Sequence, residues 1–323
     1  YNKQIIDLEK KISNENEKPN FTSEDLRKRQ YLSGLSVEDL ELILHPMAEE
    51  GKEASGSMGD DTPVAVLSSH FRPVSHYFRQ NFSQVTNPPI DSLRENKVMS
   101  LKTRFGNLGN ILDFDNLTEE NIYVLDSPIL TNSQFKKFKK FFSKKTKIID
   151  CTFDISLSLK ERIEAIREEA ETAVREGSTC LILSDKNISN QKASIPSILT
   201  VGAIHSHLVK HGLRGYCSLN VECSDALDTH SFAVLIGVGA TTVNPYLAID
   251  SIYQRFEKKL FGKNDFESCV VKFKKSIDAG LLKIMSKMGI SVISSYRGGC
   301  NFEAVGLSRA IVSDYFPGMS SRI

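Results

Sequence analysis

Short, continuous apolar runs alternate with longer amphipathic segments over most of the chain. Such runs are typical of strands buried on both faces of a parallel sheet, and the segments between them have the apolar spacing of covering helices. We therefore predict an α/β fold, a parallel sheet flanked by helices on both faces, with ligands expected at the carboxyl ends of its strands. The predicted strands are 64–68, 121–126, 147–151, 179–184 and 216–222, with two further candidates at 233–237 and 241–244. The predicted helices are 74–84, 131–142, 158–176, 196–211 and 246–260.

The first part of the chain, residues 1–55, is polar and does not follow this alternation. N-cap signals at Thr22 and Ser36 each precede an acidic first turn, which predicts two helices. The second of these is expected to end at His45-Pro46. We interpret the segment as a helical connection that packs over a neighbour, because it holds too few apolar residues to fold alone.

The remainder divides into a predicted central α/β domain at 56–263 and a shorter segment at 264–323. The latter predicts a helix at 265–287 and a strand at 289–294, with no partner strands after it. We interpret it as the first elements of a second, incomplete domain. Because the chain begins at Tyr1 rather than Met, we expect it to be a piece of a longer protein.

Composition narrows the class of protein. The 323 residues are 40% hydrophobic and 25% charged, as in ordinary globular domains. Lys and Arg number 41 against 40 Asp and Glu, so no net field attracts the whole chain to nucleic acid or an anionic membrane, and we expect neither as a partner. The six cysteines form no C-x-x-C pair, which predicts reduced thiols in a cytosol-like compartment and no metal site.

The stretch 56–63 combines two glycines, two adjacent carboxylates and a proline directly before an apolar run. Glycine permits close backbone approach, so one interpretation is a loop that contacts a ligand or another domain. The alternative is a tight turn whose aspartates accept local backbone N–H groups. Residue types alone favour the turn.

Aromatic and basic side chains interleave along the predicted helix at 131–142 and just after it. One interpretation is a basic aromatic surface for nucleic acid or membrane. The favoured one is a core-facing stripe whose lysines extend to water, because the helix lies between two predicted strands. The aromatic residues are Phe135, Phe138, Phe141 and Phe142; the lysines are Lys136, Lys137, Lys139, Lys140, Lys144, Lys145 and Lys147.

Three histidines, His205, His207 and His211, lie on one predicted helix. His207 and His211 are four residues apart, the spacing at which two imidazoles on one helix face chelate a metal. No third ligand accompanies them in the sequence. Packing or capping histidines near a helix end are therefore favoured.

Acidic residues and a histidine follow the predicted strand at 216–222. Carboxylates beyond the carboxyl end of a strand are where α/β enzymes place acids and bases, but they also cap the next helix. Neither a nucleophile nor a glycine-rich phosphate loop lies nearby, which favours capping, and no catalytic residue is assigned. The residues are Glu222, Asp225, Asp228 and His230.

Several stretches of the sequence, taken together and in order, resemble a known protein family, although no single motif does. They include SMGDDTPVAVLS at 57–68, MSKMGIS at 285–291 and SYRG at 295–298. Others are 77–91, 93–95, 212–214, 244–248 and 302–307. In this order the chain, from about residue 30 to its end, resembles the large subunit of glutamate synthase.

The resemblance implies that the chain is the central domain of such an enzyme plus the start of its FMN-binding barrel. The parent reaction makes glutamate from 2-oxoglutarate and glutamine-derived ammonia. Its expected cofactors are FMN and an iron–sulfur cluster, neither expected to bind to this fragment. Its expected partners are the amidotransferase and FMN-barrel domains of the same polypeptide, and ferredoxin or a pyridine-nucleotide-oxidising subunit. A bacterial cytoplasm or a plastid stroma is the expected compartment.

The resemblance also implies which residues meet the flavin and the keto acid. By position these are Ser57, Met58, Gly59, Asp60 and Asp61 in the acidic loop. A second group follows the predicted barrel strand and comprises Ser295, Tyr296 and Arg297.

Two rival hypotheses remain open from the sequence. One is a non-catalytic α/β interaction module that uses the same fold. The other is an α/β enzyme that uses the acidic residues and histidine after the strand at 216–222.

Overall fold

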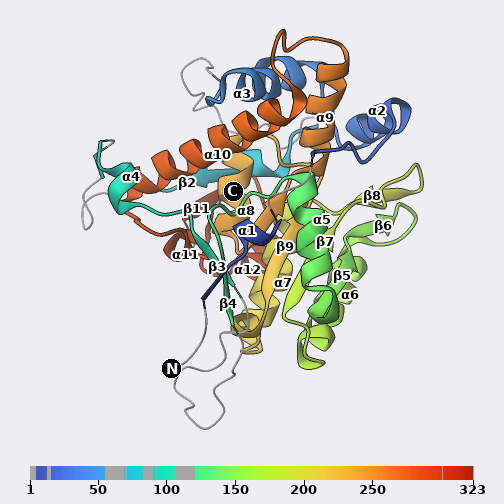
Figure 1. The fold of residues 1–323 in the computed structure, drawn as a ribbon. Coiled ribbons are helices and arrows are strands. Elements are labelled where there is room, and N and C mark those ends of the chain that lie inside the picture. Colours follow the sequence, from blue (N-terminus) through green and yellow to red (C-terminus); the bar gives the residue numbers. More distant parts are fainter. Residues whose placement is uncertain are drawn as a thin grey trace.

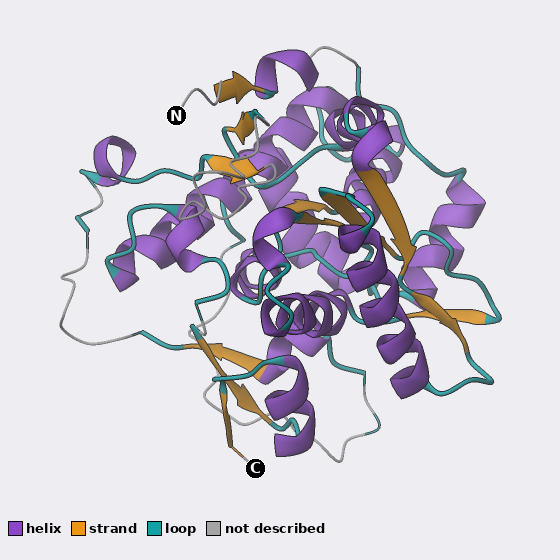
Figure 2. Cartoon of the chain, turned by 90° about the horizontal axis from the view of Figure 1, so that it is seen from below, coloured by secondary structure: helices purple, strands orange, loops and turns teal. Residues whose placement is uncertain are grey.

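The computed structural model describes residues 5–12, 16–54, 69, 71–82, 90–91, 93–105, 121–299 and 301–322 (Figures 1 and 2). At its centre lies a four-stranded sheet in the order β10-β9-β7-β5, in which every neighbouring pair is parallel. The sequence analysis predicted all four strands. Their bounds are Thr146–Asp150 (β5), Cys180–Ser184 (β7), Ser218–Glu222 (β9) and Thr242–Asn244 (β10).

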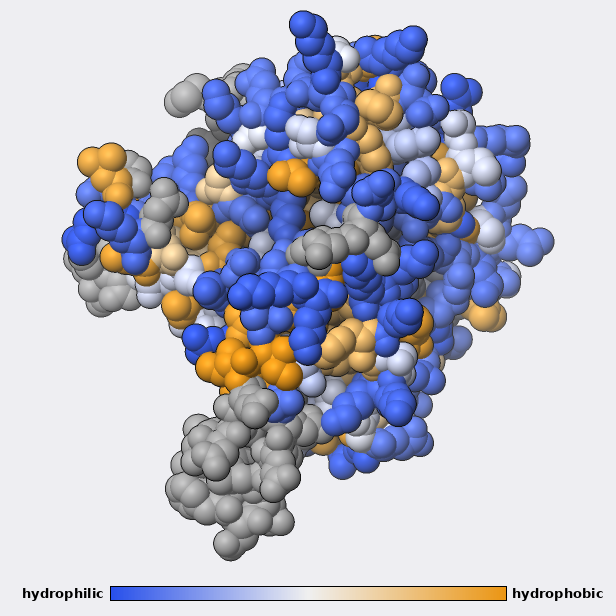
Figure 3. Space-filling model, in the orientation of Figure 1, coloured by the Kyte–Doolittle hydropathy of each residue, from blue (hydrophilic) through white to orange (hydrophobic). Residues whose placement is uncertain are grey.

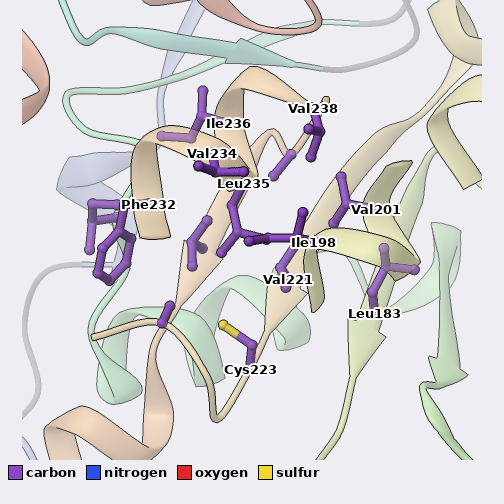
Figure 4. Packing of buried hydrophobic residues seen from close by; sticks show 14 of the residues in the cluster. Leu183, Ile198, Val201, Val221, Cys223, Phe232, Val234, Leu235, Ile236 and Val238 are labelled. Atoms are coloured by element: carbon purple, nitrogen blue, oxygen red, sulfur yellow. The ribbon is translucent and has the colours of Figure 1, made fainter. Parts of the chain in front are cut away.

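Helices cover both faces of this sheet, which confirms the predicted architecture. Along β7, Cys180 and Ile182 pack on the phenylalanines of α5 (Asn132–Phe141). The alternate residues Leu181 and Leu183 join the main core on the opposite face. Figure 4 shows this core, with Leu183 and Val221 of the sheet near side chains of the covering helices. Both faces of β7 are therefore largely apolar, which explains its continuous apolar sequence. Strand β9 differs, because its buried Ser218 and Asn220 form hydrogen bonds on one face.

The helices that alternate with the strands lie close to their predicted positions, except α8, where no helix was predicted. Predicted ranges begin or end a few residues away, because helix ends depend on local capping. They are α6 (Leu159–Arg175), α7 (Ser197–Lys210), α8 (Thr229–Gly237), α9 (Tyr246–Glu257) and α10 (Phe266–Met288). Shorter helices are α1 (Glu9–Ile12), α2 (Ser23–Leu32), α3 (His45–Glu50), α4 (Glu95–Val98), α11 (Ile293–Tyr296) and α12 (Arg309–Tyr315), with 3₁₀ turns at Val74–Tyr77, Ser143–Lys145 and Arg214–Tyr216.

Three smaller sheets surround the central one. The strand at 121–126 was predicted correctly, but it belongs to one of these and not to the central sheet. The first small sheet, in the order β1-β4-β3, contains Ile5–Asp7, Ile122–Leu125 and Thr103–Phe105. The second, β12-β11-β2, contains Ser320–Arg322, Phe302–Val305 and Phe78–Gln80, and the third is the pair β6 (Thr152–Asp154) and β8 (Lys192–Ser194).

The N-terminal caps were predicted correctly, but the end of the second helix was not. The side chains of Thr22 and Ser36 accept the backbone N–H groups of Asp25 and Asp39. The helical path does not stop at His45-Pro46, because a π-helical segment, Asp39–Leu44, runs directly into α3. Pro46 lies in the first turn of α3, where a missing N–H costs nothing.

Three predicted elements were wrong. The run 233–237 lies in α8, which is buried on all sides and therefore looks like a buried strand in sequence. The predicted helix at 74–84 is a 3₁₀ turn followed by β2, because residues 78–80 pair with β11. The predicted strand at 289–294 gives way to the short helix α11 after a single bridge from Val292 to Ser100. The predicted strand at 64–68 lies outside the described residues.

The C-terminal segment packs directly against the helices of the central sheet. A Cβ atom on Gly202 of α7 would lie 2.2 Å from the ring of Phe316, and one on Gly237 of α8 would lie 2.3 Å from Phe302. Both glycines thus permit an aromatic ring to touch the helix backbone. The domain limits after residues 55 and 263 stay predictions.

Most of the face in Figure 3 is hydrophilic, with apolar side chains in small groups and one larger apolar area in its lower half. None of the described helices combines the length and the apolarity that a bilayer span requires.

The aromatic stripe of α5 is a core feature, as the favoured interpretation predicted. Phe135, Phe138 and Phe142 are at most 7% exposed, whereas Phe141 is 41% exposed. The ring of Phe138 contacts the rings of Phe105, Phe135 and Phe142. The same helix therefore offers one fully buried and one half-exposed phenylalanine.

Replacing Phe138 by Ala is expected to lower the free energy of unfolding by about 3–5 kcal/mol, because it leaves a cavity among packed rings. The matched control, Phe141→Ala, should cost about 1 kcal/mol or less. Urea denaturation of the two variants measures both values. Equal losses would show that the stripe does not hold α5 on the sheet.

Candidate functional site

Glu222 is the last residue of β9 and the best-paired carboxylate at the carboxyl edge of the sheet. Its side chain is 3% exposed, and its Oε1 lies 2.9 Å from Nζ of Lys139 and 2.8 Å from Nζ of Lys186. The Ser184 hydroxyl donates to Oε2 over 2.8 Å. Burial alone would raise the pKa of Glu222, but the two ammonium groups outweigh it and hold the pKa below its ordinary value. Lys139 therefore pairs with a buried carboxylate instead of extending to water.

Removing this carboxylate leaves two facing ammonium groups without their anion. Glu222→Gln is expected to lower the free energy of unfolding by about 2–4 kcal/mol, somewhat less than for a fully buried pair because both lysines keep partial contact with water. Glu169→Gln removes the more exposed pair with Lys147 and should cost at most about 1 kcal/mol. Chemical denaturation of both variants gives the comparison, and similar losses would contradict the assigned role of Glu222.

The other residues proposed for an acid–base site are engaged separately. Asp225 accepts from the backbone N–H and the hydroxyl of Ser197 at the start of α7. Asp228 caps α8 by accepting the N–H of Ser231, and the ring of His230 is bonded to the carbonyl of Ser75. These side chains cap helices or hold loops, so the hypothesis of an α/β enzyme that uses them together is wrong.

Asp185 was not singled out from the sequence, although it follows β7 directly. Its Oδ2 accepts the N–H of Ser224 over 2.9 Å and the hydroxyl over 2.6 Å. Its Oδ1 is buried, and the buried hydroxyl of Tyr246 interacts with this carboxyl group. Burial, assisted by the charge of Asp225, raises the pKa of Asp185 to about 7. The residue is a buried acid poised near neutral pH.

This raised pKa has a consequence for stability. The folded state holds the Asp185 proton more tightly than the unfolded state, so protonation stabilises the fold as pH falls below about 7. The free energy of unfolding of the wild type, relative to Asp185→Asn, should rise by about 1–3 kcal/mol between pH 8 and pH 5.

Asp154→Asn is the control for this measurement. Because the bonds to Ser156 lower the pKa of Asp154, this carboxyl does not titrate between pH 5 and pH 8. Denaturant melts at several pH values measure the differences. A pH-independent difference for Asp185→Asn would contradict the assignment.

The second predicted site group, residues 295–297, does not converge on one point. Ser295 is exposed. Tyr296 is fully buried and donates its hydroxyl to Oε1 of Gln80 over 2.6 Å, so it fastens α11 to β2. In Arg297, the guanidinium atoms Nε and Nη2 are buried without a hydrogen-bond partner among the described residues. Arg297 is therefore the residue of this group suited to an external ligand.

Arg297 lies in a cationic environment. Burial lowers its pKa to about 10, and the positive charge of Arg214 contributes. Arg214 is held by the carbonyls of Cys217 and Gly239, and its Nε donates to Nδ1 of His205 over 3.1 Å. Among the described residues no carboxylate pairs with either arginine. A carboxylate or a phosphate would supply the anion that the described residues do not.

His205 connects this environment to a cavity. Because its Nδ1 accepts from Arg214, the neutral ring carries its proton on Nε2. Burial, with Arg214 and Arg297, lowers the pKa of His205 to about 4, so the ring is neutral at pH 7. His205 lines a cavity of about 180 Å³ between α7 and the C-terminal segment, together with Gly298 and Phe316.

The acidic loop at residues 57–61 lies outside the described residues. Its predicted contacts with a flavin and a keto acid stay predictions. Five of the six cysteines are free and buried, and Cys300 lies outside the described residues.

Comparison with known proteins identifies the class. The sequence model described as "Glutamate synthase central domain" matches residues 28–308. The chain is 55% identical to the glutamate synthase [NADPH] large chain of Azospirillum brasilense, over 99% of this chain and 21% of that protein. It is 42% identical to the corresponding Bacillus subtilis (strain 168) chain, over 93% and 20%. The chain belongs to the glutamate synthase central domain family.

Relatives that use a different electron donor also match. The ferredoxin-dependent glutamate synthase of Pyropia yezoensis is 39% identical over 93% of this chain and 20% of its own length. The chain thus spans about a fifth of the curated relatives it matches. Among solved structures, the flavin-binding domain of baker's yeast flavocytochrome b2 aligns over 87% of this chain and 91% of its own, with 12% identity and a TM-score of 0.43.

Proposed function

We propose that this chain is the central region of a glutamate synthase large chain, and that the whole protein makes glutamate from 2-oxoglutarate and glutamine-derived ammonia. The observation that carries the proposal is the alignment of 99% of the chain at 55% identity with a protein of that name. In the proposed enzyme this region joins the amidotransferase domain to the FMN-binding domain. The described residues of this region form a scaffold and contribute contacts to the flavin and keto-acid site.

The proposed partners follow from the same alignment. The donor of electrons is ferredoxin or a pyridine-nucleotide-oxidising subunit, since relatives are named for either kind of donor. An iron–sulfur cluster of the parent enzyme is assigned to a region outside this chain. The proposed compartment is a bacterial cytoplasm or a plastid stroma.

We assign to Arg297 the contact with an anionic group of the flavin and keto-acid site. Buried guanidinium atoms without acceptors among the described residues reduce stability, and the nearby charge of Arg214 adds repulsion. A bound carboxylate or phosphate would complete the hydrogen bonds of Nε and Nη2.

FMN, when bound, would supply electron transfer to the reaction. The residues of this chain assigned to it are Arg297 and the loop of Ser57, Met58, Gly59, Asp60 and Asp61. Arg297 fits an anionic cofactor or substrate because its free donor atoms are cationic and buried. Its part is to bind and orient the anion.

Arg297→Met in the full-length polypeptide is expected to leave the melting temperature unchanged or raise it, because an unpaired buried charge is replaced by an apolar side chain. The same variant should lose roughly 10- to 100-fold in affinity for the anion, the loss expected for a charged hydrogen bond. The measurements are thermal unfolding, flavin content and the KM for 2-oxoglutarate.

Arg309→Met is the matched control, since Arg309 is exposed at the start of α12. A raised KM with normal flavin content assigns the carboxylate of the keto acid to Arg297. A loss of flavin, with a normal KM in the fraction that retains flavin, assigns the phosphate of FMN to Arg297. A variant that is destabilised, with flavin content and KM unchanged, would show a structural role and overturn the assignment.

A further inference from the structure

Two outer helices bring together three side chains that the sequence separates. Helices α6 and α7 pack side by side (Figure 1). Glu171 of α6 faces His207 of α7 and His211, which caps that helix. Oε2 of Glu171 lies 2.7 Å from Nε2 of His207 and 3.6 Å from Nδ1 of His211. One donor atom from each of the three residues lies within 4.8 Å of the others.

We propose that Glu171, His207 and His211 form a binding site for a divalent transition-metal ion of the zinc class. Two imidazoles and a carboxylate are a ligand set that Zn²⁺ accepts, with metal–ligand bonds of about 2.0–2.2 Å. Ligand atoms of a tetrahedral ion are then about 3.4 Å apart. The observed 2.7 and 3.6 Å lie on either side of that value. Nδ1 of His211 also lies 3.0 Å from the carbonyl of His207, so metal binding requires His211 to exchange this contact for the ion.

The carboxylate is prepared for this role. A glutamate carboxylate is ionised at neutral pH, which is the form that binds a cation. Arg175 occupies Oε1 over 2.8 Å and leaves Oε2 to the histidines. The Arg175 contact orients the ligand as second-sphere partners of metal sites do.

Access also suits an ion that exchanges with solvent. The side chains of Glu171, His207 and His211 are 22%, 17% and 35% exposed, so the site is neither sealed nor fully hydrated. Three protein ligands leave a further coordination position for water or for a group of a partner. The competing interpretation, a histidine–carboxylate contact that only closes the end of α7, predicts no metal affinity.

Zinc titration of the full 323-residue chain, in competition with a fluorescent chelator, tests the proposal. The wild type should bind one Zn²⁺ that Glu171→Gln and His211→Ala bind at least tenfold more weakly. Far-UV circular dichroism and thermal unfolding without zinc confirm that the variants remain folded. X-ray absorption at the zinc edge should then show imidazole and carboxylate ligands without sulfur.

Glu168→Gln is the matched control, with the same change of charge three residues earlier on an exposed position of α6. It should bind zinc as the wild type does. An equal loss in Glu168→Gln, unchanged affinity in Glu171→Gln, or sulfur ligands in the absorption spectrum would overturn the site and assign any bound zinc to other residues.

Discussion

The whole arrangement depends on the burial of the central parallel sheet on both faces. Strand β7 directs Cys180 and Ile182 to the aromatic side of α5 and directs Leu181 and Leu183 to the larger core beneath α7 and α8. Water is excluded from both faces of the central strands, so charged groups concentrate where the strands end. Glu222 and its lysines lie at that edge because the apolar faces admit no charge.

Because water is excluded, the groups around each buried charge indicate how that charge is stabilised. Glu222 has two cations and a hydroxyl around it, and its environment is complete within the chain. Arg297 has the opposite situation: another cation nearby and two donor atoms without acceptors among the described residues. Burial raises the free energy of both groups, and among the described residues only the first is compensated. The contrast separates a structural ion pair from a residue that a ligand would complete.

The fold was largely predictable because its strongest signal is local. Continuous apolar runs gave all four central strands, and amphipathic spacing gave the helices between them. The failures came from long-range contacts: residues 78–80 became a strand only through β11, and 289–294 failed to become one because only Val292 meets a partner. The run 233–237 was misread because a helix buried on all sides has no polar face. Arg297 was proposed from the family resemblance, and its role as a ligand contact stays a prediction. Asp185 was missed, since burial and not residue type makes it unusual.

The histidine pair shows the limit of sequence spacing most clearly. His207 and His211 have the separation of two ligands, and the sequence offers no third ligand beside them. The structure supplies Glu171 from a different helix, 36 residues earlier. That contact exists because α6 and α7 are consecutive crossover helices of neighbouring parallel strands, which pack on the same face of the sheet. Ligands divided between two such helices have no fixed spacing in the sequence. Such a ligand set can be recognised only once the order of the strands, and with it the packing of the helices, is known.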